Sequence, residues 1–291
     1  MTPPSRIRTL LVLGRISNVP TVWSNCLAGW LLGGGGDLIR GADWMLFAVL
    51  CAGATLLYIG GMYLNDAFDA EFDSQHRRER PIPSGAITEK TVWRVGITLL
   101  VIGTVCLVAL GITTGILALL LCTCIVVYDV VHKIFTVSPV LMALCRVLLY
   151  LVAASAAASG ITGLAAWGAL ALGIYVIGLS YVARKEALGV KIEAWPQFLL
   201  AVPVLLSLLV NDGPFRQPAL IIAAIVSLWI IRSLRSLWVA PHHVGRAVSG
   251  LLAGIVWVDL LAVADEPRLF GAVFVALFLL AIGFQRFVPA T

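Results

Sequence analysis

Residues 43–73 read DWMLFAVLCAGATLLYIGGMYLNDAFDAEFD, a long apolar run that ends in a cluster of carboxylates. A helix needs about 20 apolar residues to cross the hydrocarbon core of a bilayer, so residues 43–66 predict a transmembrane span. Inside hydrocarbon the backbone must satisfy its own hydrogen bonds, which a helix does within one segment. This stretch therefore predicts a membrane helix with acidic side chains at its end.

The rest of the chain has the same character. Hydrophobic residues make up 60% of the sequence and charged residues 12%, with a mean hydropathy of +1.01, far from the composition of soluble domains. We expect an all-α fold, a polytopic transmembrane helix bundle of nine to ten spans that forms one integral-membrane domain over 1–291. The expected spans are 15–34, 43–66, 90–111, 115–131, 138–158, 162–183, 196–210, 216–238, 246–264 and 268–287.

The distribution of Lys and Arg predicts the orientation of these spans. If both termini are cytoplasmic, most basic residues fall on the cytoplasmic side, and the opposite connections carry only Arg40, Arg216 and Arg268. This is the asymmetry of the positive-inside rule. We expect a multi-pass protein of a cell membrane, such as a bacterial inner membrane, with the acidic stretch in the cytoplasm. The basic residues form no single face, so we expect no nucleic-acid partner.

The acidic stretch has a spacing that favours metal binding. If the helix continues past the span, Asp66, Asp69 and Asp73 stand at i, i+3 and i+7 on one face. Three like charges at a membrane boundary repel each other, so they predict a bound cation. Carboxylate oxygens suit Mg²⁺, which is usually held by one or two carboxylates together with substrate phosphates. Asn65 adds a neutral ligand, and we take these residues as candidate metal ligands and Asp66, Asp69 and Asp73 as catalytic.

Basic residues follow the carboxylates and favour a diphosphate ligand. Arg77, Arg78 and Arg80 offer planar guanidinium forks that match phosphate oxygens, and Lys133 at the end of a later span adds a further candidate. The alternative is a solvated loop whose charges only set topology. The joint occurrence of an apolar span, periodic carboxylates and the Arg80–Gly85 tail favours a site.

These residues carry a resemblance to a known family. Asn65, Asp66, Asp69 and Asp73, followed by Arg80-Pro81, resemble the first signature of the UbiA superfamily of membrane prenyltransferases. Arg15 and Asn18 resemble its Arg-x-x-Asn element, and Tyr128 with Lys133 its Tyr-x-x-x-Lys element, with one extra residue. The resemblance implies a bundle around a central cavity with a cytoplasmic polar cap, two Mg²⁺-binding motifs, and substrate-binding roles for Asn18 and Tyr128.

The second acidic motif of that family is altered here. The corresponding stretch, 175–186, contains no aspartate. Glu186 is its acidic candidate, Arg184 and Lys185 are candidates for contacting the diphosphate directly, and Tyr181 is a candidate for lining the cavity. Two interpretations follow: an active enzyme in which cations replace one metal, or an impaired site. This pattern resembles divergent UbiA-like proteins of bacterial biosynthetic clusters, including the EboC type.

Other polar residues inside spans are weaker candidates. Asp129 and Arg146 lie on either side of one connection, and we expect them to pair with each other. Asn25 is expected to hydrogen-bond within the bundle, and the sequence suggests no role for Asp259. The cysteines fall in apolar runs and are expected to be free thiols.

We interpret the chain as an intramembrane prenyltransferase. It would move a prenyl group from an allylic polyprenyl diphosphate to an unidentified acceptor, with Mg²⁺ assisting diphosphate departure and the lipid bilayer as solvent. The alternative classes are an ion-coupled transporter, a lipid-binding membrane protein, or a UbiA-like protein with impaired catalysis. A transporter would more often show an internal repeat with broken helices at the membrane midplane.

Overall fold

The computed structural model describes residues 6–35, 41, 43–133, 135–188, 194–211, 213–239, 243–266 and 268–290, except for the side chains of residues 185–188 and 214. Every regular element among them is helical, as the composition predicts. The helices are α1 (Arg6–Leu13), α2 (Val19–Leu32), α3 (Trp44–Phe68), α4 (Ala70–His76), α5 (Glu89–Val108), α6 (Ile112–Val131), α7 (Ser138–Ser155), α8 (Gly163–Leu188), α9 (Trp195–Leu199), α10 (Val202–Val210), α11 (Arg216–Trp238), α12 (Val244–Ala262) and α13 (Arg268–Gln285), with 3-10 turns η1 (Ile16–Asn18) and η3 (Gly213–Phe215).

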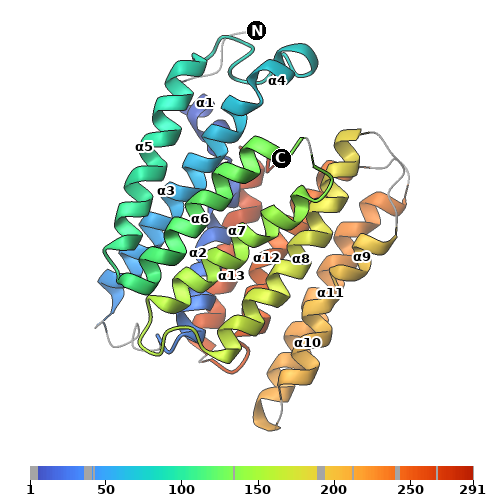
Figure 1. The fold of residues 1–291 in the computed structure, drawn as a ribbon. Coiled ribbons are helices and arrows are strands. Elements are labelled where there is room, and N and C mark those ends of the chain that lie inside the picture. The colour runs from blue at the N-terminus through green and yellow to red at the C-terminus, as the bar shows by residue number, and fades with distance from the viewer. Residues whose placement is uncertain are drawn as a thin grey trace.

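The long helices run side by side along one axis and form a multi-pass membrane bundle (Figure 1). Within the described residues, eight helices are long and apolar enough to cross a membrane: α3, α5, α6, α7, α8, α11, α12 and α13. Large apolar side chains such as Val105, Leu119 and Leu279 are exposed on the outer faces of these helices. A bundle dissolved in lipid tails leaves such faces uncovered at little cost.

The expected count of nine to ten spans is not confirmed, because two of the predicted segments form shorter helices. The first, 15–34, contains η1 and the 14 residues of α2, which at 1.5 Å per residue is shorter than the hydrocarbon core. The seventh, 196–210, is divided between α9 and α10. Pro203 at the start of α10 lacks the N–H that a continuous helix would need there.

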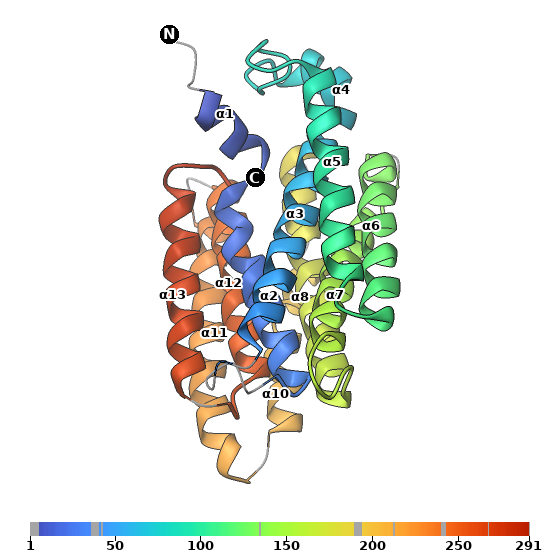
Figure 2. The same cartoon turned by 90° about the vertical axis from the view of Figure 1, so that its left-hand side faces the viewer.

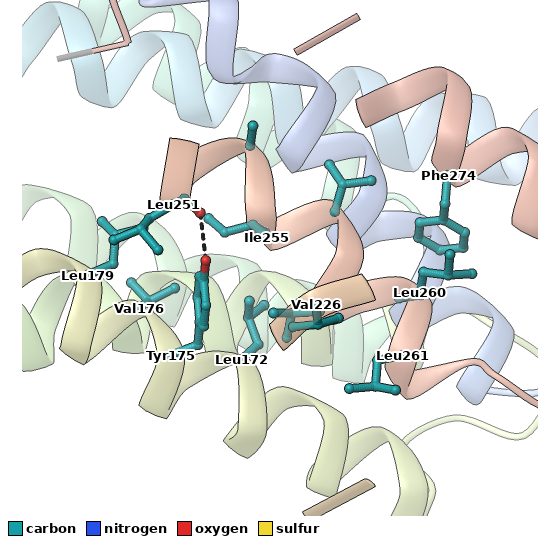
Figure 3. Close-up of a cluster of buried hydrophobic side chains, with 14 of the residues drawn as sticks. Leu172, Tyr175, Val176, Leu179, Val226, Leu251, Ile255, Leu260, Leu261 and Phe274 are labelled. Carbon is teal, nitrogen blue, oxygen red and sulfur yellow. Dashed lines mark hydrogen bonds between the residues drawn. The ribbon is translucent and has the colours of Figure 1, made fainter. Parts of the chain in front are cut away.

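The main hydrophobic core lies between α2, α7, α8, α11, α12 and α13. Tyr175 of α8 is fully buried in it, and its hydroxyl donates a hydrogen bond to the Leu251 carbonyl of α12 at 2.9 Å (Figure 3). A buried phenol needs such a partner. The hydrogen bond joins α8 to α12 inside the core.

Helices α3 and α5 approach each other closely through glycines. A Cβ atom built on Gly60 would lie 3.0 Å from the Gly96 carbonyl oxygen, and one on Gly103 would lie 2.8 Å from the Gly53 carbonyl oxygen. Small residues of this kind allow backbone-to-backbone packing in membranes. The contact holds the end of α3 in place, where the acidic stretch begins.

Short helices and connections gather at one end of the bundle. The two views agree that α1 and α4 lie at this end, whereas α10 lies at the other (Figures 1 and 2). The chain after α13 returns to the same region, where Asn18 donates a hydrogen bond from Nδ2 to the Ala290 carbonyl at 2.9 Å. We call this end, formed by α1, η1, α4 and the connection 77–88, the polar end.

Candidate active site

The acidic stretch lies at the polar end, where α3 passes into α4. Helix α3 ends at Phe68 and α4 begins at Ala70, so the two are separate helices with Asp69 between them. The helical hydrogen-bond pattern nevertheless continues, because the Asp69 N–H bonds to Asn65 and the Asp73 N–H bonds to Asp69, at 3.0 and 2.9 Å. Asp66, Asp69 and Asp73 therefore keep the common face that their spacing predicts.

Basic side chains from three other segments meet two of these carboxylates. Arg15 and Arg80 each place a guanidinium nitrogen 3.7 Å from Asp66 Oδ1. Lys133 Nζ is 2.6 Å from Asp69 Oδ1, and His132 Nε2 is 3.3 Å from the same atom. The structure thus brings the predicted residues Arg80 and Lys133 to the carboxylates, and adds Arg15 and His132.

The third carboxylate, Asp73, forms no ion pair with any side chain that the structure describes, whereas Asp66 and Asp69 do. Burial raises the pKa of Asp73, the charge of Asp69 adds to this, and the opposing charges of Arg80 and Lys133 do not offset it. Burial also tends to raise the pKa of Asp69, but the hydrogen bonds and charges of His132 and Lys133 outweigh it and lower that pKa. Asp73 Oδ1 is buried without a hydrogen-bond partner, so it retains capacity for a cation.

Arg15 reaches the carboxylates from a strained backbone position. Its φ of 41° is the one positive value among the non-glycine residues that the structure describes. Such a conformation is uncommon for a residue with a Cβ atom and is often found at functional sites. The Tyr58 hydroxyl donates to the Arg15 carbonyl at 3.2 Å, and Arg15 Nη2 donates to Asn65 Oδ1 at 3.4 Å. These contacts direct the guanidinium toward Asn65 and Asp66.

The remaining predicted site residues lie in other surroundings. Arg78 is exposed and donates to the Ser74 carbonyl of α4. Arg184 donates to Phe135 O in the α6–α7 connection at 2.7 Å and to Ser138 Oγ at the start of α7 at 3.0 Å. Tyr181 packs its ring against Trp195 of α9.

Other predicted residues lie near the carboxylates or outside the described side chains. Arg77 is half-buried and its charge acts on Asp73. Tyr128 stacks on His132 with ring centroids 5.3 Å apart. Asn18 is buried and committed to the C-terminal backbone. The side chains of Lys185 and Glu186 fall outside the part of the chain that the structure describes.

The donor set suits Mg²⁺ if the substrate supplies further ligands. Among the described residues, no three His, Cys, Asp or Glu side chains come together closely enough to hold a metal by themselves. Mg²⁺ is typically bound by one or two carboxylates plus substrate phosphate oxygens. Buried carboxylate oxygens, one of them without a partner on Asp73, fit that requirement.

An apolar cavity of about 80 Å³ lies next to the acidic stretch, between α2, α3, α6 and α7. Its polar lining comes from Tyr58, Tyr128, Asp129 and Arg146. Asp129 Oδ1 accepts a hydrogen bond from Asn65 Nδ2 at 3.2 Å, which links the cavity to the acidic stretch. A larger cavity of about 260 Å³ lies at the other end of the bundle, where α8 begins and α12 ends.

The prediction that Asp129 and Arg146 pair with each other is wrong. Arg146 Nη1 donates to Asn25 Oδ1 at 2.7 Å, and Asn25 Nδ2 donates to Asp259 Oδ2 at 2.7 Å. Ser24 donates to the same Asp259 oxygen, and Thr21 accepts two further bonds from Arg146. These residues form one buried polar network across α2, α7 and α12, in which Asn25 joins a cation to an anion.

Sequence reasoning therefore missed several residues of this region. The sequence places Arg15 in a motif but does not indicate Asp66 as its partner, and it gives no signal for His132. It also indicates no specific partner for Asn25 or Asp259. Ionisable residues within spans are functional candidates by default, but nothing in the local sequence indicates which of them meet.

Comparison with known proteins identifies the architecture. A family model described as the UbiA prenyltransferase family matches residues 21–239. A solved structure of a UbiA homolog from Aeropyrum pernix K1 is 14% identical, with a TM-score of 0.64 over 88% of this chain and 99% of that one. Another, described as digeranylgeranylglyceryl phosphate synthase in membranes, is 19% identical, with a TM-score of 0.59 over 96% of this chain and 100% of that one. At these identities the two structures establish the fold.

Two curated relatives are similar over shorter stretches. The digeranylgeranylglyceryl phosphate synthase of Ignicoccus hospitalis is 32% identical over 116 residues, which are 40% of this chain and 36% of the relative. The protein of the same name from Methanopyrus kandleri is 44% identical over 57 residues, which are 19% of this chain and 21% of the relative. The matched stretches thus cover about a third and a fifth of the length of these relatives.

Proposed function

Because this chain belongs to the UbiA prenyltransferase family, we propose that it transfers a prenyl group from an allylic polyprenyl diphosphate to an acceptor held within the bundle. The observation that carries the proposal is the group of three carboxylates at the polar end, with Arg15, Arg80 and Lys133 around two of them. Such a site binds an anion through its basic groups and a cation through its acidic groups.

The carboxylates and the basic residues have separate tasks. Asp66, Asp69 and Asp73, with Asn65 beside them, would hold Mg²⁺, which when bound neutralises diphosphate oxygens and assists their departure. Arg80 and Lys133 bind and orient the diphosphate, and Arg15 adds a third basic group beside Asp66. Fixed charges that already face the leaving group need no rearrangement as its charge develops.

The neighbouring cavity keeps water from the reacting carbon. Its lining is largely apolar, with residues such as Leu57, Met62 and Ile125, so an allylic carbon that develops positive charge would face hydrocarbon and aromatic rings rather than water. Tyr128 belongs to this lining and stacks on His132. The polar end faces the cytoplasm, as the distribution of Lys and Arg predicts.

The names of the two curated relatives make a glycerol-based lipid the first acceptor to test. An aromatic ring, a sugar phosphate and a tetrapyrrole are further acceptor classes. The stretch 175–186 lacks aspartate, and its Arg184 is already hydrogen-bonded to Phe135 and Ser138. The first acidic stretch is therefore the proposed centre of diphosphate binding.

The test is a transfer assay with the purified protein in nanodiscs, Mg²⁺, labelled prenyl diphosphates of several lengths and a panel of acceptors. Asp66→Asn and Asp69→Asn remove one charge each with little change in shape, and we expect both to abolish diphosphate release. Glu71→Gln is the matched control, because Glu71 lies on α4 but is exposed. We expect it to retain wild-type activity.

Two results would count against the proposal. If no donor releases diphosphate with any acceptor, the chain is a binding or transport protein or has an impaired site. If release occurs but is unaffected by Asp66→Asn and Asp69→Asn, the diphosphate binds elsewhere in the bundle.

A further inference from the structure

The altered stretch 175–186 is joined to the α6–α7 connection, residues 132–137, by a side chain of α8. Arg184 Nη1 donates to the Phe135 carbonyl at 2.7 Å and to Ser138 Oγ, where α7 begins, at 3.0 Å. Hydrogen bonds to a charged group are stronger than those between neutral groups. The cation that replaces the expected acidic motif therefore holds a neighbouring segment of the chain.

The same connection begins with two residues that contact the first acidic stretch. Lys133 Nζ lies 2.6 Å from Asp69 Oδ1 and 4.0 Å from the centroid of the Phe72 ring, and His132 Nε2 lies 3.3 Å from the same Asp69 oxygen. Lys133 is only two residues from Phe135, the residue whose carbonyl Arg184 holds. A lysine ammonium sits on a flexible stem, so a fixed backbone is needed to keep it in place.

The contact brings no electrostatic benefit to helix α7 itself. Arg184 binds Ser138 in the first turn of α7, and a helix N-terminus carries a partial positive charge that disfavours a nearby cation. An uncharged or acidic side chain would suit that position better. The contact is explained better by the residues that the connection carries than by the stability of α7.

We propose that Arg184 is a positioning residue for diphosphate binding, which it supports by holding the α6–α7 connection so that Lys133 faces the first acidic stretch. The inference rests on the proposed prenyl transfer. A contact between protein groups then links 175–186 to the diphosphate site, where the resemblance implies a second metal-binding motif. The alternative is a direct contact between Arg184 and the diphosphate, which would not depend on Lys133.

The experiment measures the Kd of a geranylgeranyl thiolodiphosphate with Mg²⁺ for the purified protein in nanodiscs. We expect Arg184→Gln to raise the Kd about fivefold and Lys133→Met about tenfold. Effects of independent residues multiply, whereas effects of residues that act through each other do not. The double variant should therefore bind about tenfold more weakly than the wild type, as Lys133→Met alone does, and not about fiftyfold.

A conservative variant and a control separate positioning from direct contact. Both hydrogen bonds of Arg184 come from the single nitrogen Nη1, and a lysine ammonium has three donors on one nitrogen. Arg184→Lys should therefore bind the thiolodiphosphate within about twofold of the wild type, whereas a bidentate contact with phosphate would not tolerate this change. Arg246→Gln on α12 is the control, because it removes an exposed guanidinium in the same way.

Hydrogen exchange tests the positioning role without any ligand. The Phe135 and Ser138 amides donate within the connection and its flanking helix, at 3.1 and 3.3 Å. We expect the peptide that contains them to exchange at least about tenfold faster in Arg184→Gln, the effect of losing one hydrogen bond to a charged group. Arg246→Gln should leave the exchange of this peptide unchanged.

The outcomes separate the two proposals. A Kd near the fiftyfold product in the double variant overturns the positioning role in favour of direct contact. Unchanged exchange in Arg184→Gln, or a Kd that either single variant leaves unchanged, overturns it as well. Failure of the thiolodiphosphate to bind the wild type would instead count against prenyl transfer, and the exchange rates would then decide alone whether Arg184 holds the connection.

Discussion

Replacing Asn25 with Leu tests whether the buried network holds the bundle together. Asn25 is fully buried and joins Arg146 to Asp259 by two bonds of 2.7 Å. Leu has a similar size but separates the two charged groups and bonds to neither. The variant leaves a guanidinium and a carboxylate without their shared partner in the core of the bundle.

The expected loss of stability is about 3 kcal/mol or more. Hydrogen bonds to charged groups contribute about 1.5–3 kcal/mol each, and breaking a buried ion pair on one side costs about 3–5 kcal/mol. Hydrogen bonds between helices in membranes average only ~0.6 kcal/mol each. If that value applied to the two bonds of Asn25, the variant would lose much less than about 3 kcal/mol of unfolding free energy. The charges decide between these values, because Arg146 and Asp259 are both buried and a buried charge without its partner is costly.

The assay is equilibrium unfolding in mixed micelles with increasing SDS, followed by tryptophan fluorescence. A triple variant, Asn25→Leu with Arg146→Met and Asp259→Leu, removes all three polar groups. We expect it to lie within about 1 kcal/mol of the wild type, because replacing a whole buried ionic network with apolar residues is often neutral. Thr21 and Ser24 keep their hydrogen bonds to the backbone of their own chain segment.

A single variant within about 1 kcal/mol of the wild type, the range of the average membrane hydrogen bond, would refute the reasoning. So would a triple variant as unstable as the single one, because packing rather than charge would then dominate. Thr123→Val controls for loss of a hydroxyl, because the exposed Thr123 donates to the Leu119 carbonyl of its own helix α6. It should change stability by less than about 0.5 kcal/mol.

Three further predictions concern the site and its supporting helices. Lys133→Met should raise the KM for the prenyl diphosphate about tenfold in steady-state kinetics, because Lys133 lies 2.6 Å from Asp69 at the proposed diphosphate site; an unchanged KM would place the diphosphate elsewhere. Asp73→Asn should raise the Mg²⁺ concentration for half-maximal activity at least about tenfold, since Asp73 retains a free oxygen, whereas Glu71→Gln should not; equal Mg²⁺ curves would exclude Asp73 as a ligand. Gly96→Val should destabilise the fold by about 1–3 kcal/mol in SDS unfolding, because a Cβ atom at Gly96 would lie 2.7 Å from the Leu64 side chain. Gly271→Ala is the control and should not lower the SDS midpoint, because a Cβ atom there meets nothing within 4 Å.

Most of the helices could be predicted from the sequence because their signal is local. Apolar runs of sufficient length predicted the eight long spans, and the spacing of Asp66, Asp69 and Asp73 predicted a common face that survives the break at Asp69. The first predicted span is longer than α2, and the seventh, expected as one helix, is two helices. Hydropathy reports only how apolar a segment is, and it did not reveal the division between α9 and α10 or the turn η1 before α2.

The partners of the polar residues were decided by the tertiary structure. Asn65 meets Asp129 across 64 residues of sequence, Arg146 meets Asn25 across 121, and Asn25 meets Asp259 across 234. The sequence by itself determined that buried charges exist and must be paired, since an unpaired charge in hydrocarbon is too costly. Which groups pair depends on the rotation and depth of each helix in the bundle. Packing contacts such as those between Gly60 and Gly96 set these, and they involve the whole chain at once.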